Sequence, residues 1–219
     1  MAPEPATVPA LAVVYADDAV LVLEKPAGLL SVPGRGADKQ DCLSARAQAH
    51  YPDALVVHRL DMATSGLLLM ARGKAAQRTL SQAFAAREVS KRYVALVSGC
   101  PAQPGGEWCV IDLPLAVDWP NRPRSIVQPN GGRASVTRWR VLSAPGRDPA
   151  RVELEPVTGR SHQLRVHLLA AGHPIVGDPL YALPGAPNTA PRLMLHAATL
   201  GFAHPISGQP MHFASAADF

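Results

Sequence analysis

Cysteine, aromatic residues and long apolar runs are all scarce in this chain of 219 residues. The three cysteines, Cys42, Cys100 and Cys109, are widely spaced, and no CxxC pair occurs among them. Such scattered thiols predict neither a zinc ribbon nor a thioredoxin-type site, and they are typical of a reducing compartment, here expected to be the cytoplasm. The apolar runs, such as residues 66–71, are far shorter than a bilayer crossing requires, so we expect a soluble protein with no membrane partner.

The sequence also lacks the motifs that mark common cofactor and catalytic sites. It contains no GxxxxGK[ST] loop, no strand-linked GxGxxG, no HExxH and no GxSxG. His162 and His167 are five residues apart, which is not the spacing that places two metal ligands on one face of a helix. We therefore expect no metal and no nucleotide cofactor, and the missing GxSxG motif argues against an ordinary serine hydrolase.

The composition is that of a globular chain, with 47% hydrophobic and 17% charged residues. Its length fits one sizeable domain, which we expect at residues 11–219, behind a flexible leader at residues 1–10 that contains three prolines. The formal net charge is +4, and arginine heavily outnumbers lysine. A mildly basic surface permits a polyanionic partner, although an ordinary solvated surface explains the charge equally well.

Strand-like segments outnumber helical ones, which predicts an α+β fold with a largely antiparallel or mixed sheet. Asp17 and Asp18 supply the turn of the first hairpin. Ser161 is the expected N-cap of the last helix, and Gly172 follows its end. The hairpin is expected at residues 12–28; further strands at 54–57, 66–71, 92–98, 108–115, 134–142, 151–156, 193–205 and 210–215; helices at 41–50, 74–86 and 162–171; and loops at 31–39, 58–65, 118–132 and 178–191.

The loop at residues 58–65 is rich in groups that can do chemistry. His58, Arg59 and Asp61 bring a base, a cation and a carboxylate together, and Thr64 follows closely. A loop between two apolar strands holds catalytic groups rigidly, and an ionised aspartate there can act as nucleophile or base if a cation lies near. The alternative is a turn that Asp61 and a surface arginine merely stabilise.

A second polar segment, residues 158–167, lies at the start of the last expected helix. The free N–H groups and the dipole of a helix start favour an anion, and Arg160 and Arg165 add fixed positive charge. A capped and solvated basic helix explains the same residues.

The third segment, DWPNRPR, places Trp119 and Arg122 in a proline-stiffened loop. Their planar groups suit stacking on unpaired bases, whereas the alternative packs the indole onto the core.

Five longer blocks extend these segments along the chain: KPAGLLSVPG, VHRLDMATSGLLLMAR, SKRYVALVSG, TGRSHQLRVHLLAAGHPIVGDPLY and LHAATLGFAHPISG. In their order and spacing they resemble the RluA family of pseudouridine synthases, over a span from about residue 11 to the last residue. The family fold implied by this resemblance is α+β, with a long mixed, mostly antiparallel sheet in two halves, flanked by helices, and the active-site cleft between the halves. We expect no S4 RNA-binding domain ahead of residue 11.

The resemblance also implies roles for individual residues. Asp61 matches the essential carboxylate, and Arg165 matches the arginine that keeps it ionised and aimed. Tyr93 matches the aromatic residue that stacks on the target uracil and assists proton transfer, while Leu164 packs on the other side of the ring. Arg59 matches the residue that fills the space left by the flipped base. Pairing of Arg59 with a phosphate and a core position for Tyr93 are the alternatives.

The further substrate-binding residues expected are His58, Thr64, Arg160, Trp119 and Arg122. The match to DWPNRPR points to a short branch of the family that modifies the first nucleotide of some tRNA anticodon loops and a hairpin loop of 23S rRNA. The expected partners are therefore these two RNAs, bound by a cofactor-free monomer. The alternatives are a synthase with a single or different RNA target, a non-catalytic RNA-binding protein of this fold, and a glycoside hydrolase, which would need a second carboxylate.

Overall fold

The structure is a computed structural model, and it describes residues 10–99, 101, 106–142, 148–182 and 190–219. The expected leader therefore lies almost wholly outside the described residues, as does Cys100. Cys42 is buried and Cys109 is half-buried, and neither is in a disulfide. Within the described chain, no helix is long and apolar enough to cross a membrane.

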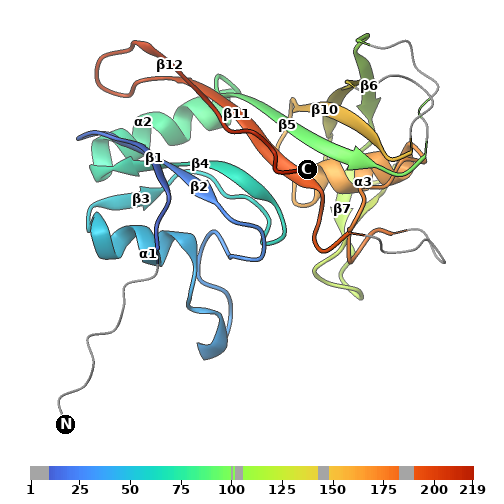
Figure 1. Cartoon of the computed structure of the whole chain (residues 1–219), viewed down its shortest axis with the longest axis horizontal. Helices are drawn as coiled ribbons and strands as arrows, with labels where there is room; N and C mark the ends of the chain where they lie inside the picture. The colour runs from blue at the N-terminus through green and yellow to red at the C-terminus, as the bar shows by residue number, and fades with distance from the viewer. Residues whose placement is uncertain (1–9, 100, 102–105, 143–147, 183–189) are drawn as a thin grey trace.

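Ten strands form one mixed sheet that runs through the whole molecule (Figure 1). Its order is β1-β2-β4-β11-β5-β10-β9-β6, with β3 added beside β4 and β12 beside β11. All pairs are antiparallel except β4 with β11. The strands are β1 (Val13–Ala16), β2 (Val20–Lys25), β3 (Ala54–Val56), β4 (Ser65–Arg72), β5 (Ser90–Val97), β6 (Cys109–Asp112), β9 (Val136–Val141), β10 (Ala150–Pro156), β11 (Leu195–Ala203) and β12 (Pro210–Ala214). The predicted α+β fold with a mixed, mostly antiparallel sheet is confirmed.

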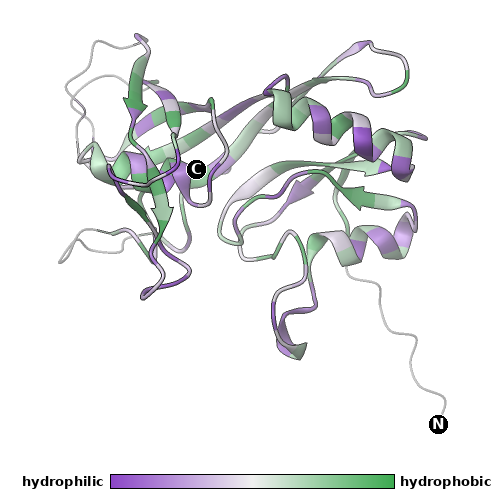
Figure 2. Ribbon diagram, turned by 180° about the vertical axis from the view of Figure 1, so that it is seen from behind, coloured by the Kyte–Doolittle hydropathy of each residue, from purple (hydrophilic) through white to green (hydrophobic). Residues whose placement is uncertain are grey.

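Two helices cover opposite faces of the N-terminal half of the sheet. Side chains from α1 (Leu43–His50) pack with Leu68 and Met70 of β4, whereas those from α2 (Gly73–Ala86) pack with Leu67 and Leu69. Because β4 is buried on both faces, its sequence is a continuous apolar run rather than an alternation. Figure 2 shows that both helices also carry polar residues, as expected for helices with one face on a sheet and the other toward solvent.

The C-terminal half of the sheet is covered on one face by α3 (Gln163–Ala170). Trp139, Leu154 and Leu168 are among the side chains that form the core between them. On the outer face, Glu153 of β10 pairs with Arg140 of β9 at 2.6 Å, and the guanidinium also lies over the ring of Trp108. Strands β9 and β10 therefore alternate between apolar and charged residues, as a sheet with one solvated face requires.

The two halves meet where β4 pairs with β11 in parallel. Gly66 has a φ of 109°, and a Cβ built on it would lie 2.4 Å from the carbonyl oxygen of Ala197. Only glycine permits this approach, which joins the strand after the Asp61 loop to a strand that crosses both halves (Figure 1).

Most of the elements predicted from the sequence are present within two or three residues of their expected ends, including the first hairpin, the three helices and the two closing strands. The predicted loop at 31–39 contains a short 3-10 helix, η1 (Ala37–Lys39). The loop predicted at 118–132 is partly wrong, because it contains strand β8 (Ser125–Val127), which pairs with β7 (Leu115–Val117) in a separate hairpin. That short strand is stabilised by packing of Leu115 and Val127 near Val166 of α3, a contact that no local pattern shows.

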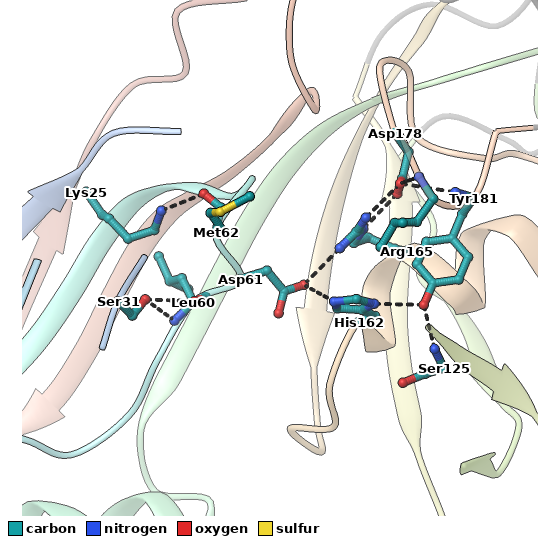
Figure 3. A network of polar contacts seen from close by, with 11 residues as sticks. Lys25, Ser31, Leu60, Asp61, Met62, Ser125, His162, Arg165, Asp178 and Tyr181 are labelled. Atoms are coloured by element: carbon teal, nitrogen blue, oxygen red, sulfur yellow. Dashed lines mark hydrogen bonds and ion pairs between the residues drawn. The ribbon is translucent and has the colours of Figure 1, made fainter. Parts of the chain in front are cut away.

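The predicted N-cap at Ser161 is also wrong. The helix α3 begins one residue later, and His162 is its cap residue, with a left-handed backbone (φ 57°) and no side-chain capping bond. The side chain of Gln163 reaches back to the segment ahead of the helix, where its Oε1 accepts from the Arg160 N–H at 3.1 Å and from the Thr158 hydroxyl at 2.7 Å. The His162 ring does not cap the helix and points toward Asp61 (Figure 3).

Candidate active site

The loop that carries Asp61 is fastened on both sides of that residue (Figure 3). Ahead of it, the hydroxyl of Ser31 donates to the Leu60 carbonyl at 2.7 Å and accepts from the Leu60 N–H at 3.1 Å. Behind it, the ammonium group of Lys25 donates to the carbonyl oxygen of Met62 at 3.0 Å. Asp61 is therefore held in place by a residue from each side, although its own side chain remains free to act.

Lys25 is fully buried and uses all three of its hydrogens on carbonyl groups. Besides Met62, it donates to Pro26 at 2.8 Å and to Leu29 at 2.7 Å. Burial lowers the pKa of this lysine to about 8, and the negative charge of Asp61 opposes that shift. The lysine thus ties the end of β2 to the Asp61 loop at the cost of removing an ammonium group from water.

Arg165 of α3 faces Asp61 from the other half of the molecule. Its Nη1 lies 3.4 Å from Asp61 Oδ2, while its Nε and Nη2 each donate to the carboxylate of Asp178 at 2.7 Å. The Arg165 side chain is only 3% exposed, and that of Asp178 is fully buried. Burial opposes the guanidinium charge, but Asp178 and Asp61 more than offset this and raise the pKa of Arg165. Asp178 therefore orients a permanent cation next to Asp61.

His162 approaches the same carboxylate oxygen, with its Nε2 3.8 Å from Asp61 Oδ2. Its Nδ1 lies 2.8 Å from the hydroxyl of Tyr181, whose ring packs under the Arg165 guanidinium at 4.9 Å. Burial lowers the pKa of His162, although Asp61 pulls in the opposite direction, so the ring is neutral at neutral pH.

A cavity of about 810 Å³ opens over the Asp61 carboxylate. Tyr93 of β5, Leu164 of α3 and the buried Thr64 are among its lining residues, and the Thr64 N–H donates to the Asp61 carbonyl. Burial, and next the charge of Asp61, raise the pKa of Tyr93, so its hydroxyl keeps its proton. The cavity thus combines an apolar and aromatic slot with a single carboxylate.

The remaining charges that line the cavity are positive. Arg59, Arg87, Lys91 and Arg160 all lie on its wall, and none of the four forms an ion pair within the described part of the chain. Asp61 is the one acidic residue among the described residues that line it. Cations without carboxylate partners are available to bind phosphates, so this cavity suits a polyanion.

Three of the predicted site residues do not present a free side chain to the cavity. His58 lines the cavity, but its Nε2 accepts from the Leu69 N–H at 2.9 Å and its ring stacks on Phe84, so burial and the nearby Lys91 lower its pKa to about 3. Trp119 and Arg122 are not part of the cavity wall. They lie at the tip of the β7–β8 hairpin, close to Pro123, which does line the cavity. The indole is 67% exposed, with the guanidinium 4.4 Å from its ring, so the alternative of a core-packed Trp119 is wrong.

Comparison with known proteins identifies the chemistry that this arrangement serves. Residues 19–170 match the family model described as RNA pseudouridylate synthase. The chain belongs to the RNA pseudouridylate synthase family. The predicted resemblance, made on HRLD and GRSHQLRVH, is thereby confirmed, and the chain is an enzyme that converts uridine in RNA to pseudouridine.

Relatives within this family match almost the whole chain. The dual-specificity RNA pseudouridine synthase RluA of Escherichia coli O6:H1 is 51% identical over 211 residues, which cover 96% of this chain and 95% of that protein. The protein of the same name from Haemophilus ducreyi is 47% identical over 94% of this chain and 92% of its own length. Among solved structures, human RNA pseudouridylate synthase domain containing 1 matches with a TM-score of 0.75 and 29% identity, covering 97% of this chain and 86% of that one.

Sequence reasoning missed several residues that this synthase brings to the site. Lys25, Asp178 and Tyr181 lie within the blocks KPAGLLSVPG and GDPLY that carried the resemblance, but no role was assigned to them. The feature that could have pointed to them is that each is an ionisable or hydroxyl-bearing residue near the edge of a matching block. Lys91 shared this feature, since it lies near the start of the block SKRYVALVSG, whereas Arg87 gave no signal, because only the turn between α2 and β5 brings it to the cavity.

Replacing Lys25 tests how the Asp61 loop is held. Lys25→Met is expected to lower the free energy of unfolding by about 3 kcal/mol, because the carbonyl oxygens of Pro26, Leu29 and Met62 lose their donor together. Urea unfolding followed by circular dichroism measures the loss. Lys74→Met, at an exposed position of α2, is the matched control and should change stability by less than about 0.5 kcal/mol. Equal losses in the two variants would contradict this account of Lys25.

Because the pKa of Lys25 is lowered, the stability difference between the wild type and Lys25→Met should depend on pH. In the folded protein this pKa is about 8, against an ordinary value of 10.5, so between these values the unfolded chain binds more protons than the folded one. The contribution of Lys25 to the free energy of unfolding therefore rises with pH through that window. The stability difference between the wild type and Lys25→Met should be larger at about pH 10 than at about pH 7. A difference that stays constant would contradict the shift.

Proposed function

We propose that this synthase modifies uridines in two structured RNAs, a tRNA anticodon stem-loop and a hairpin of 23S rRNA, with Asp61 as its catalytic carboxylate. The observation that carries the catalytic assignment is the position of Asp61, which is the one acid among the described residues of a basic cavity, lies 3.4 Å from Arg165 and shares that cavity with Tyr93. The term "dual-specificity" in the names of relatives about half identical to this chain supports two RNA targets. Both RNAs are found in the cytoplasm, where the enzyme would work as a monomer.

The reaction needs a carboxylate but no oxidant, reductant or outside atom. The bond from N1 of uracil to C1′ breaks, the base turns, and C5 bonds to C1′; C5 loses its proton and N1 gains one. An ionised Asp61 serves either of two routes, attack on C1′ or removal of the 2′ proton to give a glycal. The fixed charge of Arg165 favours the ionised carboxylate on both routes, since the pair lies 3.4 Å apart.

The slot above Asp61 is the proposed place of the flipped uracil. Tyr93 would stack on one face of the base and Leu164 on the other, and both line the cavity. Removing a base from its stack costs a few kcal/mol, about the energy that stacking on one aromatic ring returns. Arg59 is exposed on the rim, where its long side chain can fill the space that the base leaves in the RNA.

The RNA backbone would bind to the unpaired cations of the cavity wall. Arg160 lies beside the start of α3, and Arg87 and Lys91 lie where α2 turns into β5. The exposed Trp119, with Arg122 stacked on it, is placed to contact an unpaired base of the loop and so to contribute to substrate choice. His58 and Thr64 support the Asp61 loop from within.

A nucleoside assay tests this function. The purified protein is incubated, without added metal or nucleotide, with an unmodified tRNA anticodon stem-loop and with the 23S hairpin, and the nucleosides are separated by chromatography. Pseudouridine is expected in both RNAs with the wild type and in neither with Asp61→Asn. Chromatography is required because the product has the same mass as uridine.

Each other outcome corrects a different part of the proposal. Pseudouridine in only one RNA would leave the family assignment intact and reduce the targets to one. Its absence from both, with RNA still bound, would mean that the target is another RNA. Unchanged activity in Asp61→Asn would overturn the catalytic assignment.

The role of Arg165 is tested by separating turnover from binding. Arg165→Ala should lower the single-turnover rate roughly 100-fold to 1,000-fold, because the cation next to Asp61 is removed, while the RNA dissociation constant changes by less than about threefold. Arg165→Ala also leaves the Asp178 carboxylate buried without its partner. Arg165→Lys is therefore made in parallel, because it keeps the positive charge but not the paired hydrogen bonds. Normal turnover with weakened binding would show that Arg165 contacts RNA rather than supporting Asp61.

The cavity wall predicts a change in the salt dependence of binding. Each phosphate that the wall no longer neutralises should reduce the slope of log affinity against log salt by about 0.7 for single-stranded RNA. The double variant Arg87→Gln, Lys91→Gln should therefore bind the stem-loop more weakly and with a shallower slope, as filter binding at several salt concentrations would measure. Arg78→Gln, exposed on α2 outside the cavity wall, is the control and should leave the slope unchanged.

A further inference from the structure

A chain of polar contacts leads from the β7–β8 hairpin to the catalytic carboxylate (Figure 3). The backbone N–H of Ser125, at the start of β8, donates to the hydroxyl of Tyr181 at 2.7 Å. That hydroxyl lies 2.8 Å from His162 Nδ1, and His162 Nε2 lies 3.8 Å from Asp61 Oδ2. The same hairpin presents Trp119 at its exposed tip.

The direction of these contacts follows from the hydrogens available. The Tyr181 hydroxyl accepts from the Ser125 N–H, so its single hydrogen is available to His162 Nδ1, and we assign the contact in that direction. A neutral imidazole that accepts at Nδ1 carries its hydrogen on Nε2, so the ring offers an N–H to Asp61. Burial raises the pKa of Tyr181, so its hydroxyl retains the hydrogen on which this order depends.

The link to Asp61 is longer than a hydrogen bond, whereas the rest of the chain of contacts is tight. The His162–Asp61 distance is 3.8 Å and the Arg165–Asp61 distance is 3.4 Å, so the carboxylate is held loosely from both sides. Moreover, His162 keeps its left-handed backbone without any capping bond in return. A strained conformation of this kind persists only where surrounding contacts enforce it, and here those contacts aim the ring at the carboxylate.

We propose that His162 and Tyr181 are positioning residues that transmit docking of the β7–β8 hairpin on RNA to the Asp61 carboxylate. In this account, which rests on the proposed function, RNA held by Trp119 draws the hairpin toward the cleft. The Ser125 N–H, the Tyr181 hydroxyl and the His162 ring move with it, and the Nε2–H closes its hydrogen bond to Asp61. Correct substrate thereby completes the alignment of the carboxylate, whereas a misdocked RNA leaves it loosely held.

We call the chain of contacts from Ser125 through Tyr181 and His162 to Asp61 the relay. Two substitutions remove contacts at different points of this relay. Tyr181→Phe keeps the ring under Arg165 but removes the hydroxyl, and His162→Asn tolerates the left-handed backbone and still reaches Tyr181 but no longer reaches Asp61. Each should lower the single-turnover rate at saturating RNA about tenfold and change the RNA dissociation constant less than about threefold. The double variant should be no slower than the slower single variant. Tyr15→Phe, which removes a remote hydroxyl bonded to Asp17, is the matched control and should keep the wild-type rate.

The coupling to the hairpin is tested with Trp119→Ala. In the wild-type background this change should weaken RNA binding and also lower the saturating rate; in the Tyr181→Phe background it should weaken binding alone. Residues coupled through one relay give such non-additive effects, whereas independent sites give rate effects that multiply. Multiplying effects, or wild-type rates in both relay variants, would overturn the proposal. If Tyr181→Phe does not fold, as thermal unfolding would reveal, His162→Asn with Trp119→Ala decides it.

This outcome is distinct from failure of the proposed function. Absence of pseudouridine from both RNAs with the wild-type enzyme would overturn the assigned targets before any variant is made. Normal wild-type turnover with multiplying variant effects would leave those targets in place and remove only the relay.

Discussion

The paired hydrogen bonds between Arg165 and Asp178 are the interaction on which the site depends. Both side chains are removed from water, so each charge is tolerated only because the other neutralises it at 2.7 Å. Asp178 uses two of the nitrogens of the guanidinium, and this fixes the direction of the third toward Asp61. The buried Arg165–Asp178 pair of the C-terminal half thereby sets where the Arg165 guanidinium lies relative to the Asp61 loop of the N-terminal half.

The two halves contribute unlike components to catalysis. The N-terminal half holds the backbone on either side of Asp61, through Ser31 and Lys25, while leaving its carboxylate without a short contact. The C-terminal half supplies Arg165, His162 and the β7–β8 hairpin. Strands β5 and β11 cross between them, and the parallel contact at Gly66 keeps the Asp61 loop close to that crossing (Figure 1). The backbone on either side of Asp61 is therefore held by hydrogen bonds, whereas Arg165 Nη1 and His162 Nε2 lie 3.4 and 3.8 Å from its carboxylate.

The parts that could be predicted from sequence are those set by local pattern or by a matching block. The run around Leu68 predicts a buried strand, and HRLD and GRSHQLRVH identify Asp61 and Arg165, which the structure brings within 3.4 Å of each other. The parts that could not be predicted depend on contacts between distant segments. Strand β8 depends on the packing of Val127 near α3. The helix start at His162 rather than Ser161 is accompanied by hydrogen bonds from Thr158 and Arg160 to the side chain of Gln163. No local propensity contains either contact.

The electrostatics of the cavity explain why the arginine beside Asp61 must be buried. RNA brings phosphates, and so further negative charge, into a space where Asp61 is the single acid among the described lining residues. In the proposed binding mode the cations on the wall pair with those phosphates, and the exposed ones among them are also screened by salt. Arg165 is shielded from both effects because its side chain is only 3% exposed and its geometry is set by Asp178 rather than by the substrate. The buried Arg165 and the cations on the wall are therefore separate sources of positive charge within one cavity.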